Sequence, residues 1–288
     1  MGGACRAARR RFSIPPQALW SLLAGPTGRR GRLAVATRRG GVRVFLDVEA
    51  VLFDMGGTLL DYPMPSWPVM AARCLEGAYA YLVRPESELA PPAAAMPDPA
   101  EAHARRARPA TGAPIAHRAM MGLRRVVRSL SGRTLPRMAE ACTRPLLAHG
   151  RPFDDALPVT LALKERGYRL GLVSNTPWGT PEYLWSKQLD RFGLAEHFAV
   201  RCFSSDIGFR KPDPRIFESA LQRLGVRPER AVFVGDDPAA DIAGAARLAM
   251  RTVLLLRPGH RRLPGDAKPD LCVTTLHQLL AHLPPRCT

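Results

Sequence analysis

The segment 51–59 contains the residues of this chain best suited to chemistry. An apolar stretch ends on Asp54, and Gly56, Gly57 and Thr58 follow almost at once. A carboxylate at the end of a buried strand, with an open backbone turn behind it, is suited to attack on a phosphate or a halide. The second position after Asp54, where a helper carboxylate would be expected, is glycine.

Three later segments of the chain carry polar residues at or near the ends of apolar stretches. The polar residues of each segment, taken alone, have an ordinary explanation as a helix cap, a turn or a surface lysine. Together they supply acids, a hydroxyl with an amide, and a lysine, which is the set needed to hold a divalent cation beside a dianionic group. The residues are Ser174, Asn175, Lys211, Asp236, Asp237 and Asp241.

These segments require a sheet that brings their strands together. Residues 50–53 form a short apolar run of the kind expected for a buried parallel strand. From residue 155 onward, strands predicted at 169–174, 200–203, 231–235 and 252–255 alternate with helices predicted at 157–166, 181–192, 214–224, 239–248 and 276–283. Such alternation predicts an α/β fold with a doubly wound parallel sheet, whose ligands lie at the carboxyl ends of the strands.

The segment 63–150 interrupts this pattern between the first strand and the rest. It has helix-like stretches at 69–81 and 119–130, separated by a Pro- and Ala-rich stretch at 91–114, and no strand pattern. We therefore expect residues 48–62 and 151–288 to form the core and residues 63–150 to form an inserted helical cap.

The net charge of +17 comes largely from residues 1–47, which we expect to form a basic, disordered leader. The first 46 residues contain ten arginines and no acidic residue. The leader weakly resembles a twin-arginine export signal or an organelle transit peptide. We favour an unstructured extension, or a start codon assigned too far upstream. No aromatic and basic interleaving indicates a nucleic-acid-binding module.

The remaining composition favours a globular cytoplasmic protein. No apolar run approaches the roughly 18 to 20 residues of a membrane span. The six cysteines are scattered without a Cys-x-x-Cys pair, and we interpret them as reduced thiols. The sequence does not indicate an oligomeric state.

The segment around Asp54 and the three later polar segments, in this order and spacing, resemble the signature motifs of the haloacid dehalogenase-like hydrolase superfamily. The resemblance runs from about Val48 to Leu283, and the insertion resembles the C1-type cap of subfamily I. It implies a Rossmann-like core and a small phosphorylated substrate. It also implies that Asp54 is the nucleophile, that Ser174 hydrogen-bonds the transferred group and that Lys211 neutralises charge.

The same resemblance implies roles for the other residues. Asn175 would shape the pocket, and Gly57 and Thr58 would lie against the phosphate. The implied cofactor is Mg²⁺, which suits an all-oxygen site. Its ligands would be Asp54, Asp236 and the Gly56 carbonyl. Asp241 would bind the ion or orient a water molecule, and Asp237 would be either a ligand or a helix cap.

Gly56 departs from the pattern of the family's phosphatases, which usually have a second aspartate there as general acid and base. That group contributes on the order of a hundredfold to ten-thousandfold. The cap offers His103, His117, His149 and Glu76 as other proton donors, or the substrate has a good leaving group. We expect a Mg²⁺-dependent phosphatase that forms a phosphoaspartyl intermediate. A 2-haloacid dehalogenase using Asp54 and a weakly active or inactive scaffold remain as alternatives.

Overall fold

The computed structural model describes residues 36–39, 42–63, 67–82, 134–177, 180–257 and 268–286. These residues belong to one compact unit, which spans Ala36–Thr288. Residues 1–35 of the expected leader, the helix expected at 119–130 and the Pro- and Ala-rich stretch at 91–114 lie outside the described residues.

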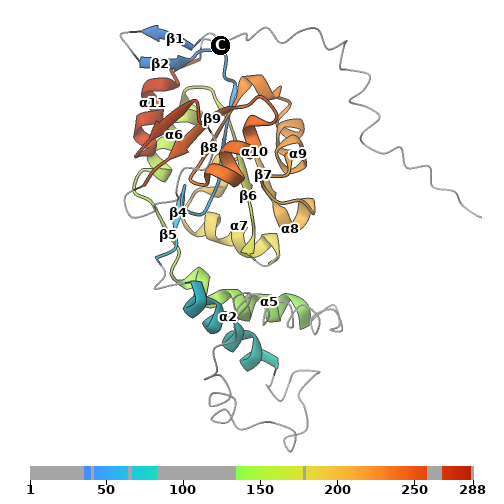
Figure 1. Ribbon diagram of the computed structural model, residues 1–288. Coiled ribbons are helices and arrows are strands. Elements are labelled where there is room, and N and C mark those ends of the chain that lie inside the picture. Colours follow the sequence, from blue (N-terminus) through green and yellow to red (C-terminus); the bar gives the residue numbers. More distant parts are fainter. Residues whose placement is uncertain are drawn as a thin grey trace, which may run out of the picture. The chain divides into compact units, whose positions relative to one another are not determined.

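A six-stranded parallel sheet forms the centre of the structure (Figure 1). Its order is β10-β9-β8-β3-β6-β7, so β3 lies between β8 and β6 and the strand order reverses there. This topology confirms the predicted doubly wound α/β fold, whose ligand sites lie outside such a reversal. The strands are β3 (Ala50–Phe53), β6 (Arg169–Ser174), β7 (Val200–Phe203), β8 (Ala231–Gly235), β9 (Arg251–Leu255) and β10 (Leu271–Val273).

Helices cover both faces of the sheet, which explains why β3 is apolar at every position. Val51 and Phe53 point into one core with α6 (Ala156–Glu165), whereas Ala50 and Leu52 point into a second core with α9 (Pro214–Leu224). Figure 1 shows these two helices on opposite sides of the sheet. The other core helices are α7 (Glu182–Arg191), η3 (Ala195–His197), α8 (Ser204–Ile207), η4 (Pro228–Arg230), η6 (Leu276–Gln278) and α11 (Leu279–His282).

The strands expected at 50–53, 169–174, 200–203 and 231–235 and the helix expected at 214–224 have the predicted bounds. The single helix expected at 239–248 is wrong. The chain forms a π-helical turn, η5 (Pro238–Ile242), followed by the short α10 (Ala243–Ala246). The Asp237 carbonyl accepts from Ile242 N five residues on, which widens the turn that carries Asp241. Such turns are frequent at functional sites.

Two short strands lie within the segment that was expected to lack regular structure. β1 (Ala36–Arg39) and β2 (Val42–Phe45) form an antiparallel hairpin, so that expectation is wrong for these residues. Val44 and Phe45 are buried, and β2 packs beside α11. Burial of these two side chains stabilises strands whose local sequence gives little strand periodicity.

Two helices that lie between β3 and β6 in the sequence pack against each other. They are α2 (Trp67–Leu82), which contains the helix expected at 69–81, and α5 (Thr134–Ala148), which the sequence did not predict. β4 (Leu60–Asp61) pairs with β5 (Arg151–Pro152), so the chain leaves the core and returns to it at adjacent points. The assignment of residues 63–150 as a separate cap domain stays a prediction.

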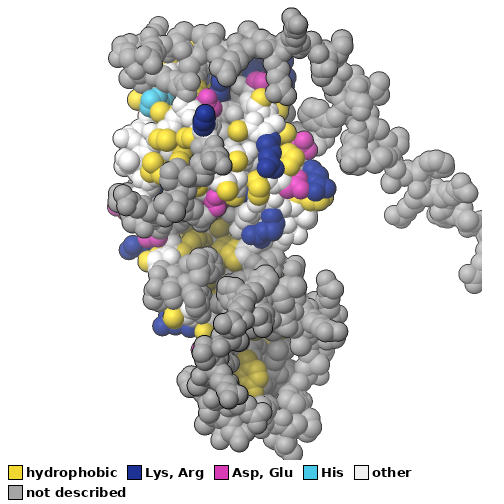
Figure 2. Space-filling view, viewed as in Figure 1, with side chains coloured by type: hydrophobic (Ala, Val, Ile, Leu, Met, Phe, Trp, Pro, Cys, Tyr) yellow, Lys and Arg dark blue, Asp and Glu magenta, His cyan; other side chains and the backbone are white. Residues whose placement is uncertain are grey.

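Among the described residues, no helix is both long and apolar enough to cross a membrane. On the face drawn in Figure 2, the described Lys and Arg side chains are dispersed among apolar and acidic ones.

Candidate active site

The carboxyl ends of β3, β6 and β8 form one edge, and the residues that follow them converge there. Phe53 is in register with Leu172 on one side and Val234 on the other, and Asp54 N donates to the Val234 carbonyl over 2.9 Å. Asp54 therefore leaves the sheet between Ser174, the last residue of β6, and Asp236, which follows β8. Asp54 and Asp236 are 7% and 6% exposed and Ser174 is 4% exposed.

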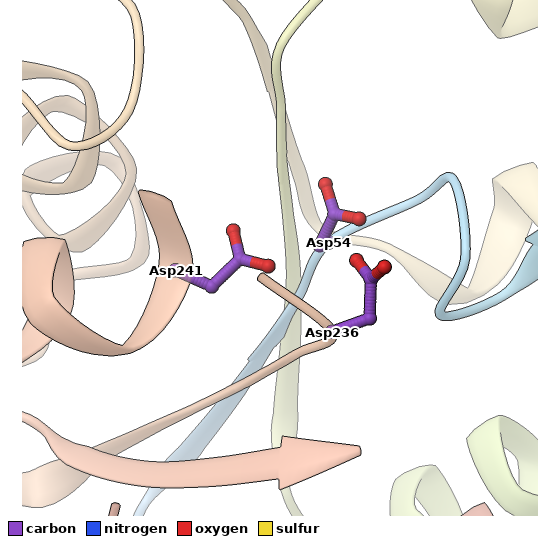
Figure 3. A group of neighbouring side chains, drawn as sticks. All are labelled: Asp54, Asp236 and Asp241. Atoms are coloured by element: carbon purple, nitrogen blue, oxygen red, sulfur yellow. The ribbon is translucent and has the colours of Figure 1, made fainter. Parts of the chain in front are cut away.

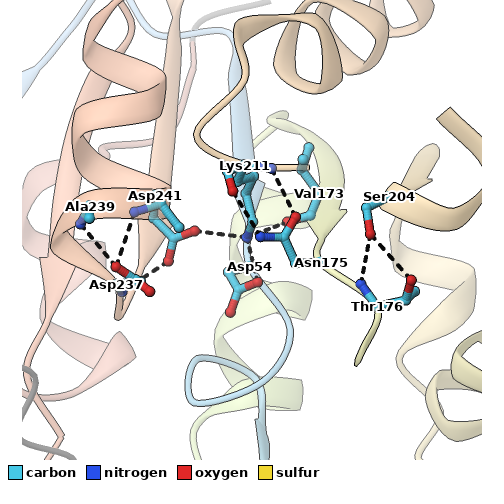
Figure 4. Close-up of polar contacts among 10 residues, drawn as sticks. Asp54, Val173, Asn175, Thr176, Ser204, Lys211, Asp237, Ala239 and Asp241 are labelled. Carbon is cyan, nitrogen blue, oxygen red and sulfur yellow. Dashed lines mark hydrogen bonds and ion pairs between the residues drawn. The ribbon is translucent and has the colours of Figure 1, made fainter. Parts of the chain in front are cut away.

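Lys211 lies at the centre of this edge and joins two of the acids (Figure 4). Its Nζ is 2.6 Å from Asp54 Oδ1 and 2.7 Å from Asp241 Oδ1, and it donates to the Val173 carbonyl over 2.9 Å. The lysine side chain is only 2% exposed. Burial opposes its charge, but the two carboxylates outweigh burial and raise the pKa of Lys211 above its ordinary value, so it stays an ammonium.

The pKa of Asp241 reflects its burial and the negative charge beside it. Burial first, and then the Asp54 carboxylate, raise the pKa of Asp241 to about 6, although Lys211 acts in the opposite direction. One ammonium therefore does not balance the carboxylates at this edge.

Three carboxylates point toward one another from two strand ends and η5 (Figure 3). Asp54, Asp236 and Asp241 each offer an oxygen within 4.8 Å of the others, and all three side chains are buried. Such a set, with an excess of negative charge and oxygen donors alone, fits a small hard divalent cation. The structure thus brings together three of the residues predicted as metal ligands.

Asn175 holds the loop that carries Lys211. Its Nδ2 donates to the Lys211 carbonyl over 3.1 Å, and its Oδ1 accepts from Lys211 N over 2.9 Å. Thr176 secures the adjacent backbone, because its N–H donates to Ser204 Oγ and its carbonyl accepts from Arg210. The arrangement fixes where the ammonium lies.

Asp237 has the geometry of a helix cap. Its Oδ1 accepts from the backbone N–H groups of Ala239 and Ala240 over 2.9 and 3.0 Å. Its own N–H donates to Asp241 Oδ2 over 3.0 Å, which orients the Asp241 carboxylate toward Lys211. A side chain on Gly235 would collide with that carboxylate, so the glycine is needed for the close approach.

The chain matches the family model of haloacid dehalogenase-like hydrolases over residues 48–248, which is more than half of its length. This chain belongs to the haloacid dehalogenase-like hydrolases. The glyceraldehyde 3-phosphate phosphatase of Methanopyrus kandleri is 38% identical over 136 residues, which are 46% of this chain and 57% of the relative. The phosphoserine phosphatase of Thermus thermophilus is 40% identical over 127 residues, 44% of this chain and 49% of the relative. The chain thus spans roughly half the length of these curated relatives.

Solved structures of this hydrolase family share the fold. A HAD phosphatase from Thermococcus onnurineus superimposes with a TM-score of 0.52 and 25% identity, covering 81% of this chain and 96% of that one. A 2-haloacid dehalogenase from Pseudomonas syringae pv. Tomato gives a TM-score of 0.53 at 24% identity, covering 81% of this chain and 96% of that one. Because the identity to the dehalogenase is below 25%, that likeness shows a shared fold and does not favour dehalogenation over phosphate hydrolysis.

The loop after β3 of this hydrolase is supported by a buried ion pair that the sequence did not predict. Thr58 is fully buried, and its carbonyl accepts from Arg257 Nη2 over 2.8 Å. Arg257 in turn binds both oxygens of Asp155, at 3.1 and 2.7 Å. No motif marks this pair in the sequence, because its two members lie 102 residues apart and support the loop through the backbone of Thr58.

Gly57 has the left-handed φ of 85°, and a Cβ on it would lie 2.5 Å from Asp236 Oδ2. The glycine therefore lets the loop approach the carboxylate. Gly56 has no such restriction. A Cβ there would meet only the ring of Tyr62, whose Cε2 and Cδ2 atoms would be 3.7 and 3.8 Å away.

The proton donors proposed from the sequence receive no support from their placement. Glu76 on α2 and His149 after α5 are both exposed. His103 and His117 lie outside the described residues. Among the described residues, the side chain that lies beside Gly56 is instead that of Tyr62, which no motif marks in the sequence.

Proposed function

We propose that this hydrolase is a Mg²⁺-dependent phosphatase that cleaves a small phosphomonoester through a phosphoaspartyl intermediate on Asp54. The observation that carries the proposal is the convergence of three buried carboxylates, of which Asp54 and Asp241 contact the Lys211 ammonium. Three clustered carboxylates fit a cation that offsets the charge of a phosphate dianion, whereas in a metal-free dehalogenase site they would repel the departing halide.

The contacts of Asp54 suit nucleophilic attack. Lys211 binds Oδ1 over 2.6 Å, which fixes the carboxylate and leaves Oδ2 to form the bond to phosphorus. As that bond forms, the ester bond breaks and the alcohol oxygen leaves with the electron pair. Water then hydrolyses the phosphoaspartate and releases phosphate. The Lys211 ammonium stabilises the charge of the phosphoryl oxygens, which is the kind of effect that often dominates catalysis.

The remaining residues have roles that their positions support. Ser174 ends β6 at the same edge, so its hydroxyl is suited to donate to a phosphoryl oxygen, and Gly57 and Thr58 lie in the adjoining turn. Asn175 engages the Lys211 backbone with both ends of its amide, so we assign it a positioning role.

Asp54 and Asp236, with the Gly56 carbonyl, would hold the magnesium ion. Bound there, the ion would draw charge from the transferred phosphoryl group. Asp241 already forms an ion pair with Lys211 through one oxygen and accepts from Asp237 N through the other. We therefore assign it to orienting Lys211 beside the ion.

The names of the relatives support a small phosphorylated substrate. Two of them are phosphatases for glyceraldehyde 3-phosphate and for phosphoserine, and both match this chain at 38% identity or more. We propose a phosphomonoester of similar size.

A panel of phosphate esters, assayed with Mg²⁺ and with EDTA, tests the proposal. We expect phosphate release that requires the metal and is lost in Asp54→Asn. Asp237→Asn is the matched control, because asparagine still caps a helix. It should stay active if Asp237 is a cap, whereas loss of activity would make it a ligand.

The same samples decide between the alternatives. Turnover of esters that needs no metal, or that survives Asp54→Asn, would contradict the proposal. Chloride release from a 2-haloacid in EDTA would establish the dehalogenase. A folded wild type that shows neither reaction would favour the scaffold.

A further inference from the structure

We propose that Tyr62 replaces part of the missing acid at position 56 by donating its phenolic hydrogen bond to the leaving oxygen of the ester. The inference rests on the proposed phosphatase function and assigns a further residue to the same site. It starts from the space around Gly56, where a helper carboxylate would lie.

The Tyr62 ring occupies the space next to that position. A Cβ built on Gly56 would lie 3.7 Å from Tyr62 Cε2 and 3.8 Å from Cδ2, which is ordinary van der Waals contact. Tyr62 follows β4, the strand that continues the loop after Asp54, so the chain that carries the nucleophile also carries the ring. Any side chain at position 56 would therefore point toward this phenol.

Neighbouring residues hold the ring in place. It packs edge-on against Trp185, with the ring centroids 6.2 Å apart. On its other edge, Cε1 would lie only 2.8 Å from a Cβ on Gly150, so the glycine leaves room for the ring. Tyr62 is therefore confined between α7 and the backbone that returns from α5.

The hydroxyl of Tyr62 is buried and has no hydrogen-bond partner among the described residues. Such a group is costly in a folded protein, and buried tyrosine hydroxyls usually find a partner. Tyr168 provides the contrast, because its hydroxyl donates to the Pro284 carbonyl over 2.7 Å. A buried donor without a partner, on a ring that lies beside Gly56 and near enough to Asp54 for its charge to act on the phenol, is suited to a substrate oxygen.

The electrostatic surroundings favour donation over proton abstraction. Burial, and secondarily the charge of Asp54, raise the pKa of Tyr62 well above its ordinary value, so the phenol keeps its proton. It can stabilise the oxygen that leaves with the electron pair of the broken P–O bond. The leaving alkoxide then takes its proton from water, and Tyr62 ends the step unchanged. The phenol is not suited to act as the base that activates water in the second step.

The test is Tyr62→Phe, measured with two substrates whose leaving groups differ. An alkyl phosphate, such as glycerol phosphate, depends strongly on a donor at the leaving oxygen, and 4-nitrophenyl phosphate does not. We expect kcat/KM of the variant to fall on the order of a hundredfold for the alkyl ester, the effect typical of losing one such donor. For the nitrophenyl ester we expect a change of only a few fold.

Thermal unfolding separates this role from a structural one. Because the wild-type hydroxyl is buried without a partner, Tyr62→Phe should unfold at the same temperature as the wild type or higher. Tyr168→Phe is the matched control. It removes a hydroxyl that is hydrogen-bonded, so it should lower the melting temperature and affect both substrates equally.

Gly56→Asp adds a second measurement, because the local space accepts a side chain there. If the new carboxylate protonates the leaving oxygen, it should restore alkyl-ester turnover to the Tyr62→Phe protein. Equal losses for both esters, or a lower melting temperature of Tyr62→Phe, would overturn the inference while the phosphatase stands. A wild type that hydrolyses no phosphate ester would overturn the proposed function, and the inference with it.

Discussion

Replacement of Lys211 by methionine tests the electrostatics of the site most directly. The substitution keeps the length of the side chain and removes the ammonium that lies 2.6 Å from Asp54 and 2.7 Å from Asp241. Both carboxylates then face each other without their counter-ion in a site that is almost closed to water. Loss of one partner of a buried ion pair typically costs about 3 to 5 kcal/mol, and we expect a loss of unfolding free energy in this range in EDTA at pH 8.

The loss of unfolding free energy in Lys211→Met should depend on pH and on Mg²⁺. In the metal-free protein, the folded-state pKa of Asp241 is about 6, above the roughly 3.9 of an unfolded chain. The contribution of Asp241 to the free energy of unfolding is therefore fully present below pH ~4 and is lost as pH rises through 6. Removing Lys211 raises that pKa further, so the gap between wild type and variant should widen from pH 5 to pH 8. Added Mg²⁺ should narrow it by supplying the missing positive charge.

Urea unfolding at the two pH values, with EDTA or Mg²⁺, provides the measurement. Lys187→Met is the matched control, because Lys187 is 64% exposed and lies 3.6 Å from Glu140. Such a surface pair contributes at most about 1 kcal/mol. The reasoning is refuted if the two variants lose the same stability, or if the Lys211→Met loss is the same with and without Mg²⁺.

Three further substitutions probe the parts that support the site. Gly57→Ala should abolish Mg²⁺-dependent turnover and weaken Mg²⁺ binding in calorimetry, because the Cβ needs the space of the Asp236 carboxylate; unchanged binding would contradict this. Arg257→Met should cost about 3 kcal/mol in urea unfolding, because it leaves Asp155 buried without its cation, and a loss below 1 kcal/mol would contradict the role of the pair. Asp213→Ala should cost about 1 kcal/mol at pH 7 through loss of an N-cap. Hydrogen bonds from Arg215 lower the pKa of Asp213 to about 2, so the difference in unfolding free energy between wild type and variant should shrink as pH falls from about 4 through 2. A difference as large at pH 2 as at pH 7 would be evidence against that charge effect.

The core elements could be predicted because their local pattern and their burial agree. β3 is apolar throughout since both faces are covered, and α9 is flanked by the N-cap Asp213 and by Gly225, which has a left-handed φ. The hairpin β1–β2 could not be predicted. Its strands depend on burial of Val44 and Phe45 against distant parts of the chain, which no local pattern records.

Some residues of the site could be predicted from the sequence and others could not. Asp54, Lys211 and Asp236 could be found because strand ends in a parallel sheet meet at one edge, so their order along the chain fixes their proximity. Tyr62 and Arg257 could not be found. Tyr62 gains its significance from the absence of a side chain at Gly56, and Arg257 acts through a backbone carbonyl.

The position of Tyr62 separates the two chemical steps of the proposed reaction. A phenol that keeps its proton assists departure of the alcohol but offers no base for the water that attacks the phosphoaspartate. With glycine at position 56, the second step lacks that help for every substrate, and we expect it to limit turnover. Because the phosphoaspartate is the same whichever ester formed it, kcat should be nearly equal across good substrates, while kcat/KM follows the leaving group. Rapid mixing should then show a burst of alcohol close to one equivalent of enzyme. A kcat that varies with the leaving group as steeply as kcat/KM would show that the first step limits and that Gly56 does not slow the second.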